Sequence, residues 1–272
     1  MEWMEANGVS LRYELAGGAS PAGSNVTSQT VLLIHELGGA LDSFDECVGL
    51  FQGHFRTLRY DQRGFGHSEK IRGAIAMQDM VSDIVALLDG LGITAPVHAT
   101  GAGVGAGIAI ALAARAPDRV ARLAIASPAT FIPADLHGRL TERAATVERE
   151  GMRYFADASL ALSYPEVLRG DRRRFEKYRL RWIANDPHCF AAINRMHMKT
   201  NLVPELKNIR CPTLVIGCRH NTIRPPAMSR GVAEAIAGAR YVEVDSGHFM
   251  PAETPELFAR QVIPFFQEQG ND

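Results

Sequence analysis

Short apolar runs rich in β-branched residues alternate along the chain with segments whose apolar residues recur every three or four positions. The first pattern is typical of buried strands and the second of amphipathic helices. The apolar runs predict strands at 31–34, 57–60, 96–100, 123–125, 213–216 and 241–244. The helical spacing predicts helices from Met77 to Leu91, from Met228 to Ile236 and over 255–266. This alternation favours an α/β fold, in which helices cover both faces of a mostly parallel sheet.

The amino-terminal segment adds an antiparallel pair of strands to this sheet. Residues 3–6 and 10–15 flank the dipeptide Asn7-Gly8. Asn-Gly favours the type I′ turn of a two-residue hairpin, because both central residues of that turn need a positive φ. Together with the six later strands, the hairpin predicts an eight-stranded sheet.

The strand pattern stops between Pro133 and Pro204, where charged, aromatic and helix-compatible sequence replaces it. We therefore expect a core domain formed by 1–130 and 206–272, with a helical lid, or cap, at 131–205. An insertion between two strands lies over their carboxyl ends, where open α/β sheets bind ligands. Residues 169–181 of this cap hold seven basic and two acidic side chains. They form either a solvated helix face or an attractor for an anionic substrate.

Charge and composition exclude several classes of protein. The 272 residues include 29 Lys and Arg against 30 Asp and Glu, which leaves no basic excess for binding nucleic acid. The sequence has no apolar run of about 18 residues and no secretory signal pattern at its start. Its four cysteines form no C-x-x-C pair, and its nine histidines lack metal-binding spacing. We expect a cytoplasmic protein without a metal, a cofactor, a nucleic-acid partner or a membrane segment.

One motif has two interpretations. Gly101-Ala102-Gly103-Val104-Gly105-Ala106 follows a predicted strand and satisfies the glycine pattern of dinucleotide-binding folds. Those folds also need an acidic residue about 20 positions further on, at the end of the next strand. Here that strand ends in Ser127-Pro128, so dinucleotide binding is disfavoured.

Four motifs, each after a predicted strand, occur in one order: His35-Glu36-Leu37-Gly38-Gly39, Tyr60-Asp61-Gln62-Arg63-Gly64-Phe65-Gly66-His67-Ser68, Gly101-Ala102-Gly103-Val104-Gly105 and Asp245-Ser246-Gly247-His248. This order resembles the α/β-hydrolase fold family from end to end. The stretch from Ile236 to Glu243 and the tripeptide Glu150-Gly151-Met152 resemble the 3-oxoadipate enol-lactonase branch. The resemblance is good in the core and weaker in the cap.

The resemblance implies a catalytic triad of serine, histidine and an acid, and this chain keeps one of the three. His248 matches the histidine. Gly103 occupies the position of the serine nucleophile, and Asn221 occupies the position of the acid. An engineered replacement of the serine by glycine, made to trap a ligand, would explain Gly103. It would not explain Asn221, because removal of the nucleophile alone already stops the reaction.

The same resemblance places the oxyanion donors at the backbone N–H groups of Leu37 and Val104, with His35 beside them. Where the family has His-Gly, this chain has Glu36, which is either an acid/base group at the rim of the pocket or a surface glutamate. His220 is either a second imidazole in the site or an exposed loop histidine. Cys218 as a replacement nucleophile is disfavoured, because only His248 could serve it as a base.

Two functions remain open at this stage. The first is a cofactor-independent enzyme that acts on a small, anionic carbonyl or carboxylate compound, as in aromatic catabolism. Its chemistry would be of the isomerase, lyase or decarboxylase type, or hydrolysis by activated water, with His248 as the base. The second is a ligand-binding or regulatory protein on a hydrolase scaffold that has lost catalysis. The sequence specifies neither the substrate nor the oligomeric state.

Overall fold

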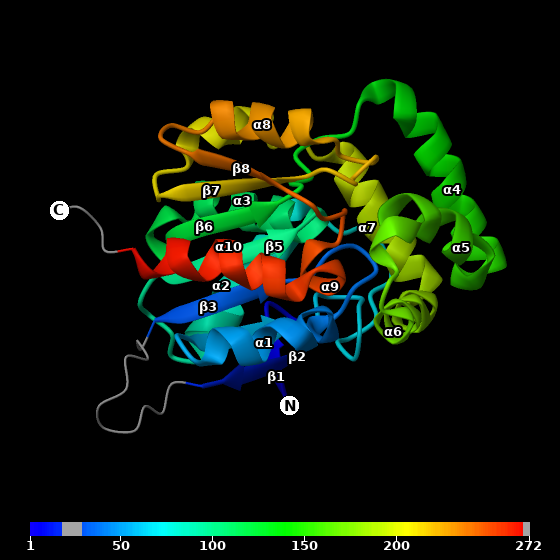
Figure 1. The fold of residues 1–272 in the computed structure, drawn as a ribbon. Helices are drawn as coiled ribbons and strands as arrows, with labels where there is room; N and C mark the ends of the chain where they lie inside the picture. Colours follow the sequence, from blue (N-terminus) through cyan, green and yellow to red (C-terminus); the bar gives the residue numbers. More distant parts are fainter. Residues whose placement is uncertain (18–28, 269–272) are drawn as a thin grey trace.

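A computed structural model describes residues 1–17 and 29–268, which form one mostly parallel sheet with helices on both faces (Figure 1). The eight strands are β1 (Glu2–Ala6), β2 (Val9–Ala16), β3 (Thr30–Ile34), β4 (Arg56–Tyr60), β5 (Val97–Ala102), β6 (Val120–Ala126), β7 (Thr213–Cys218) and β8 (Arg240–Val244). Their order in the sheet is β1-β2-β4-β3-β5-β6-β7-β8. The pairs β1/β2 and β2/β4 are antiparallel, and all other pairs are parallel. The predicted eight-stranded α/β-hydrolase fold is confirmed.

The first two strands form the predicted hairpin. Asn7 and Gly8 at its turn have φ angles of 51° and 74°, as a type I′ turn requires. Because β2 pairs with β4 through Tyr13 and Tyr60, the hairpin extends the sheet at one edge.

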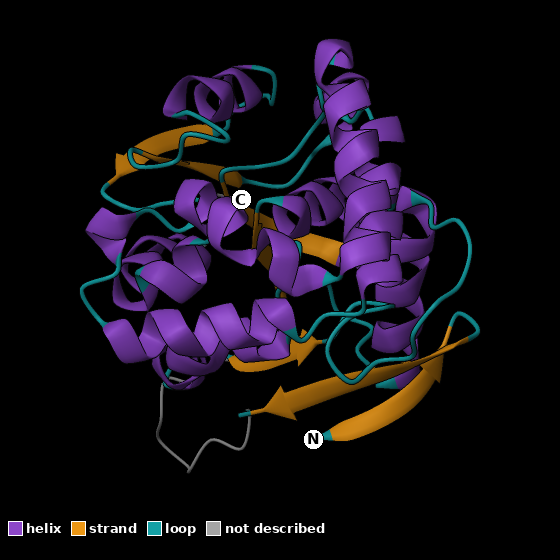
Figure 2. Ribbon diagram, turned by 90° about the vertical axis from the view of Figure 1, so that its right-hand side faces the viewer, coloured by secondary structure: helices purple, strands orange, loops and turns teal. Residues whose placement is uncertain are grey.

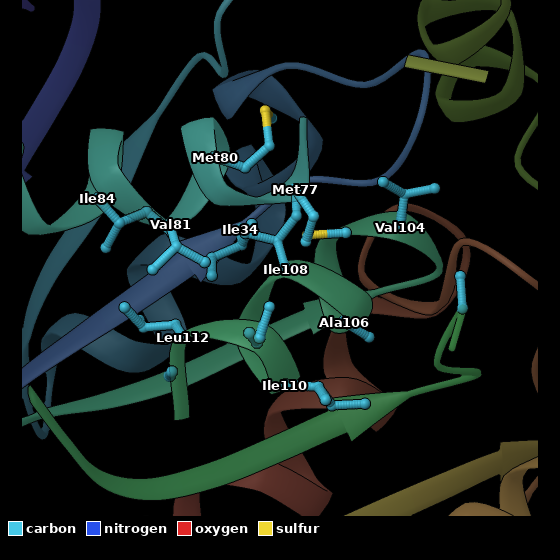
Figure 3. Close-up of a cluster of buried hydrophobic side chains, with 14 of the residues drawn as sticks. Ile34, Met77, Met80, Val81, Ile84, Val104, Ala106, Ile108, Ile110 and Leu112 are labelled. Carbon is cyan, nitrogen blue, oxygen red and sulfur yellow. The ribbon is translucent and has the colours of Figure 1, made fainter. Parts of the chain in front are cut away.

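Helices cover the two faces of the sheet and build two separate cores. Helices α1 (Asp45–Gln52) and α10 (Pro255–Gln267) pack on one face, where Phe51 and Phe258 lie in the core. Helices α2 (Met77–Gly90), α3 (Val104–Arg115) and α8 (Pro226–Glu234) contribute to the core on the other face. Figure 3 shows Val81 and Ile84 of α2 near Ile108 of α3 and Ile34 of β3. The short α9 (Met250–Glu253) precedes α10.

The segment between β6 and β7 is helical, as the sequence predicts. It holds α4 (His137–Glu150), α5 (Met152–Ser163), α6 (Arg172–Ile183) and α7 (Pro187–Lys199), which stand together at the right end of the sheet in Figure 1. Figure 2, which views the molecule from that side, shows these helices in front of the strands. We call these four helices the cap; the domain boundaries given above stay a prediction.

Candidate active site

The centre of the candidate site is the turn between β5 and α3. Gly103 has φ 55° and ψ −119° at this turn, a backbone conformation that glycine adopts without a Cβ clash. The backbone after this turn packs closely on β3, since a Cβ atom at Gly105 would lie 2.2 Å from the carbonyl oxygen of Ile34. Gly103 directly follows β5 and so lies at the carboxyl end of that strand.

His248 lies directly over this turn. A Cβ atom at position 103 would lie 3.1 Å from His248 Nε2 and 3.4 Å from its Cε1. The loop that carries His248 follows β8. Glu253 holds this loop, because its Oε2 accepts a hydrogen bond from the backbone N–H of Phe249 at 3.0 Å. The structure thus brings together Gly103 and His248, which are 145 residues apart in the sequence.

Asn221 fixes the direction of the hydrogen bond to His248. Its Oδ1 accepts the backbone N–H groups of Ile223 at 3.0 Å and Arg224 at 2.9 Å. The amide nitrogen Nδ2 therefore faces His248 Nδ1, 3.0 Å away, and donates to it. Because Nδ1 accepts, a neutral His248 carries its proton on Nε2. The atom of His248 that faces Gly103 is then a hydrogen-bond donor.

The charge of Arg224 and burial both keep the neighbouring histidines neutral. Burial, followed by the charge of Arg224, lowers the pKa of His248 to about 3. The same two causes lower the pKa of His197 of α7 to about 3, with a smaller contribution from His248. Neither imidazole is charged at neutral pH.

The loop after β3 supplies the other predicted donors. Leu37 donates its backbone N–H to no group in the described part of the chain, and Val104 is the first residue of α3, where a helix leaves its N–H unused. His35 holds this loop in place. Its Nε2 accepts the backbone N–H of Gln62 at 3.0 Å, and its Nδ1 donates to the carbonyl oxygen of Glu36 at 2.8 Å. His35 is fully buried, and its predicted place beside the oxyanion donors stays a prediction.

Glu36 is buried under the cap and is not the surface glutamate of the second interpretation above. Its Oε1 accepts the hydroxyl groups of Ser43 at 2.8 Å and of Tyr178 of α6 at 2.9 Å. Its Oε2 has no hydrogen-bond partner among the described residues. Glu36 therefore connects the loop after β3 to the cap. Its predicted acid/base role stays a prediction.

Two further candidates lie outside this arrangement. His220 is half-buried beside Asp245, whose pKa is lowered mainly by Arg219 and to a lesser extent by His220. Cys218 is fully buried, and burial raises the pKa of its thiol to about 12. A thiol with this pKa is not ionised at neutral pH and is a poor nucleophile.

Three of the seven basic side chains in the segment at 169–181 are paired with acidic side chains. Arg174 pairs with Glu46, Lys177 with Asp45 and Arg179 with Asp157, at 2.6 to 2.7 Å. These pairs satisfy a large part of the excess charge on the cap surface, which favours the solvated-face interpretation.

A cavity of about 310 Å³ lies between α7 and the loop at 71–75. Apolar residues such as Ile75 and Met196 line it, together with charged side chains that include Arg72, Arg195 and Lys199. None of its lining residues is among the predicted site residues. In the described ranges 1–17 and 29–268, no group of three His, Cys, Asp or Glu side chains could hold a metal ion, and no helix has the length and apolar character to span a membrane.

Sequence reasoning missed three buried residues around His248: Arg224, His197 and Glu253. Arg224 precedes Pro225 in the loop that carries Asn221, and a basic residue so close to the acid position was the available signal. No spacing rule links His197 to this loop, because it comes from the cap. Burial raises the pKa of Glu253 well above that of an ordinary glutamate, although the backbone N–H groups of Phe249 and Gly247 oppose the shift.

The fold agrees with comparisons to known proteins. The model of a family described as serine aminopeptidase, S33, matches residues 26–245. The crystal structure of an enol-lactonase from Burkholderia xenovorans LB400 has 31% sequence identity and a TM-score of 0.89, and the match covers 98% of this chain and 100% of that one.

Two curated proteins are similar over nearly their whole length. "Putative carbamate hydrolase RutD" of Caulobacter sp. (strain K31) is 27% identical over 265 residues, which cover 96% of this chain and 97% of that protein. The 3-oxoadipate enol-lactonase 2 of Acinetobacter baylyi is 24% identical over 263 residues, which cover 95% and 94%. The enol-lactonase-like character predicted from the motifs agrees with these similarities.

Proposed function

The chain belongs to the α/β-hydrolase family described as serine aminopeptidase, S33, and we propose that it is a cofactor-independent enzyme that forms no serine ester. The proposal starts from Gly103, which stands at the strand-to-helix turn without a side chain to attack a carbonyl. It assigns catalysis to the donors that surround this turn. Its substrate class is a small compound with a carbonyl group, as the resemblance to the enol-lactonase branch implies.

The direction of the hydrogen bonds around Asn221 carries this proposal. Because Asn221 donates to His248 Nδ1, the Nε2–H group is the part of the ring that faces Gly103. The backbone N–H groups of Leu37 and Val104 are the other two donors by position. Three donors directed at one point favour a reaction in which negative charge develops on a substrate oxygen.

This arrangement favours some of the predicted reaction classes over others. Water activation or proton abstraction by His248 would need Nε2 without its proton, which is the tautomer that Asn221 disfavours. We therefore assign His248 the role of a donor in place of the predicted base. Decarboxylation of a 3-oxo acid needs no base. The electrons of the broken C–C bond move to the ketone oxygen, carbon dioxide leaves, and water protonates the enolate.

The test is a product assay on small 3-oxo acids such as acetoacetate, followed by ¹³C NMR. We expect wild-type protein to release carbon dioxide and the ketone above the uncatalysed rate. His248→Ala removes one donor and should lower kcat by about 10²–10³-fold. His67→Ala, a change at an exposed histidine, is the matched control and should leave kcat unchanged. The donor role fails if His248→Ala keeps wild-type kcat, and catalysis of this class fails if wild-type protein leaves every 3-oxo acid unchanged.

A second candidate function is a ligand-binding or regulatory protein. It is favoured by the absence, among the described residues, of an acidic side chain in hydrogen-bond contact with His248. Calorimetric titration separates the two functions, because a binding protein returns its ligand unchanged after long incubation. In that case His248→Ala would weaken binding by about 1 kcal/mol, the net contribution of a single hydrogen bond.

A further inference from the structure

Arg224 is a buried cation without a counter-ion. Its side chain is only 6% exposed, and it forms no ion pair with any carboxylate in the described part of the chain. Its Nη2 donates to the carbonyl oxygen of Phe131 at 3.0 Å and to His197 Nε2 at 2.9 Å. Buried charges in folded proteins are usually paired, because an unpaired charge loses its hydration without compensation. The arrangement around Arg224 therefore lacks one negative group.

His197, which contacts Arg224, has a buried N–H group without a hydrogen-bond acceptor among the described residues. A guanidinium group only donates, so His197 accepts through Nε2 and, when neutral, carries its proton on Nδ1. This Nδ1 is buried and has no hydrogen-bond partner among the described residues. On the other side, Asn221 contacts both Arg224 and His248: its Oδ1 accepts the backbone N–H of Arg224 at 2.9 Å, and its Nδ2 donates to His248 Nδ1 at 3.0 Å.

We propose that Arg224 binds a carboxylate group of the ligand, so that the site takes a small acid with a carboxylate as well as a reacting carbonyl. The position of the carbonyl rests on the proposed function, whereas the carboxylate contact does not. A guanidinium group matches the planar carboxylate through paired donors. The charge also fits, because both histidines are neutral and one carboxylate balances the single charge of Arg224. A phosphate dianion would leave an excess negative charge in the buried site.

The binding test uses levulinate, which has a ketone and a carboxylate but is not a 3-oxo acid, and its neutral amide. Calorimetric titration at constant ionic strength gives the Kd of each. We expect wild-type protein to bind levulinate at least tenfold more tightly than the amide. Arg224→Met should weaken levulinate binding by about 10- to 100-fold, the range for a hydrogen bond to a charged group, and should leave amide binding unchanged.

Matched variants keep the test decisive. Arg173→Met removes a charge from an exposed position of the cap and should bind levulinate like the wild type. Arg224→Lys keeps the charge but loses the planar pair of donors, so it should bind levulinate several-fold more weakly, and it replaces Arg224→Met if that variant does not fold. Inorganic phosphate that binds as tightly as levulinate, through Arg224, would overturn the assignment to carboxylates.

Three outcomes overturn the proposal: wild-type protein that fails to bind levulinate, equal affinity for the acid and the amide, or Arg224 variants that bind levulinate as the wild type does. These outcomes differ from failure of the proposed function. If levulinate binds through Arg224 but no 3-oxo acid is converted, the carboxylate contact stands and the catalytic proposal fails. If 3-oxo acids are converted but levulinate binds equally to the wild type and to Arg224→Met, the catalytic proposal stands and the carboxylate contact fails.

Discussion

Replacing Asn221 by aspartate should invert the tautomer of His248 without changing the shape of the site. A carboxylate at this position can still accept the backbone N–H groups of Ile223 and Arg224 through one oxygen, at 3.0 and 2.9 Å in the present structure. Its other oxygen would face His248 Nδ1, now 3.0 Å from an amide nitrogen, and would require a proton there. Nε2 would then become an acceptor above Gly103.

The magnitude follows from the hydrogen bonds that each tautomer keeps. In the wild type, a proton on Nδ1 would face the Asn221 amide N–H and leave a buried donor unsatisfied, which costs about 1–3 kcal/mol. This corresponds to a preference of about 5- to 150-fold for the proton on Nε2. If His248 acts as a donor, the aspartate variant loses that donor, and kcat on a 3-oxo acid should fall by about 10²–10³-fold at pH 8.

Two measurements on the same samples check this reasoning. The ¹⁵N shifts and ring couplings of His248, assigned by comparison with His248→Ala, report which nitrogen carries the proton in each protein. Asn208→Asp, at an exposed position, introduces the same charge away from the site and should change neither the spectrum nor kcat. A wild-type spectrum with the proton on Nδ1, or a higher kcat in Asn221→Asp, would refute the donor role and restore His248 as the base.

Three further predictions concern esterase chemistry, the cap and pH. The double change Gly103→Ser with Asn221→Asp should produce measurable hydrolysis of an activated small ester, more than Gly103→Ser alone, and a folded double variant at the background rate would mean that the oxyanion donors or His248 are misplaced. Tyr178→Phe removes a hydrogen bond to buried Glu36 and should lower the free energy of unfolding in urea by about 1–3 kcal/mol, whereas Tyr164→Phe, whose hydroxyl has no hydrogen-bond partner among the described residues, should not. The pKa of His197 is about 3 when folded and about 6.5 when unfolded, so the unfolded state binds more protons between these values and stability should fall as pH decreases through that window. Substituting His197→Gln should make the fall shallower in urea titrations at pH 7, 5.5 and 4, and equal slopes would contradict the shift.

The sequence predicted the strands and the main helices of the core because each has a local cause. Alternating runs and helical spacing are properties of neighbouring residues, and the Asn7-Gly8 turn depends on two residues alone. The meeting of Gly103 and His248 was predicted by the resemblance to the α/β-hydrolase family. It is compatible with the sheet, because both residues follow strands whose carboxyl ends lie along one edge.

What the sequence could not predict depends on contacts between distant segments. The cap buries Glu36 through Tyr178, which is 142 residues further on. Arg174 of the basic segment is paired with Glu46, 128 residues earlier. The donor character of Asn221 depends on two backbone N–H groups of its own loop and on the position of His248, which comes from a different loop. The burial of Glu36, the pairing of Arg174 and the hydrogen-bond direction of Asn221 are therefore decided only in the folded chain.

The turn at Gly103 also has an evolutionary consequence. A Cβ atom would lie 2.6 Å from the Ile34 carbonyl oxygen at Gly101 and 2.2 Å from it at Gly105, so close packing on β3 constrains the backbone on both sides of the apex. The path of the turn is thus inherited with the architecture and not with the reaction. A lineage can exchange the residue at the apex, and with it one mode of catalysis for another, while the surrounding scaffold stays under the same selection for packing. Relatives with different chemistries can then share a backbone this similar without sharing a nucleophile.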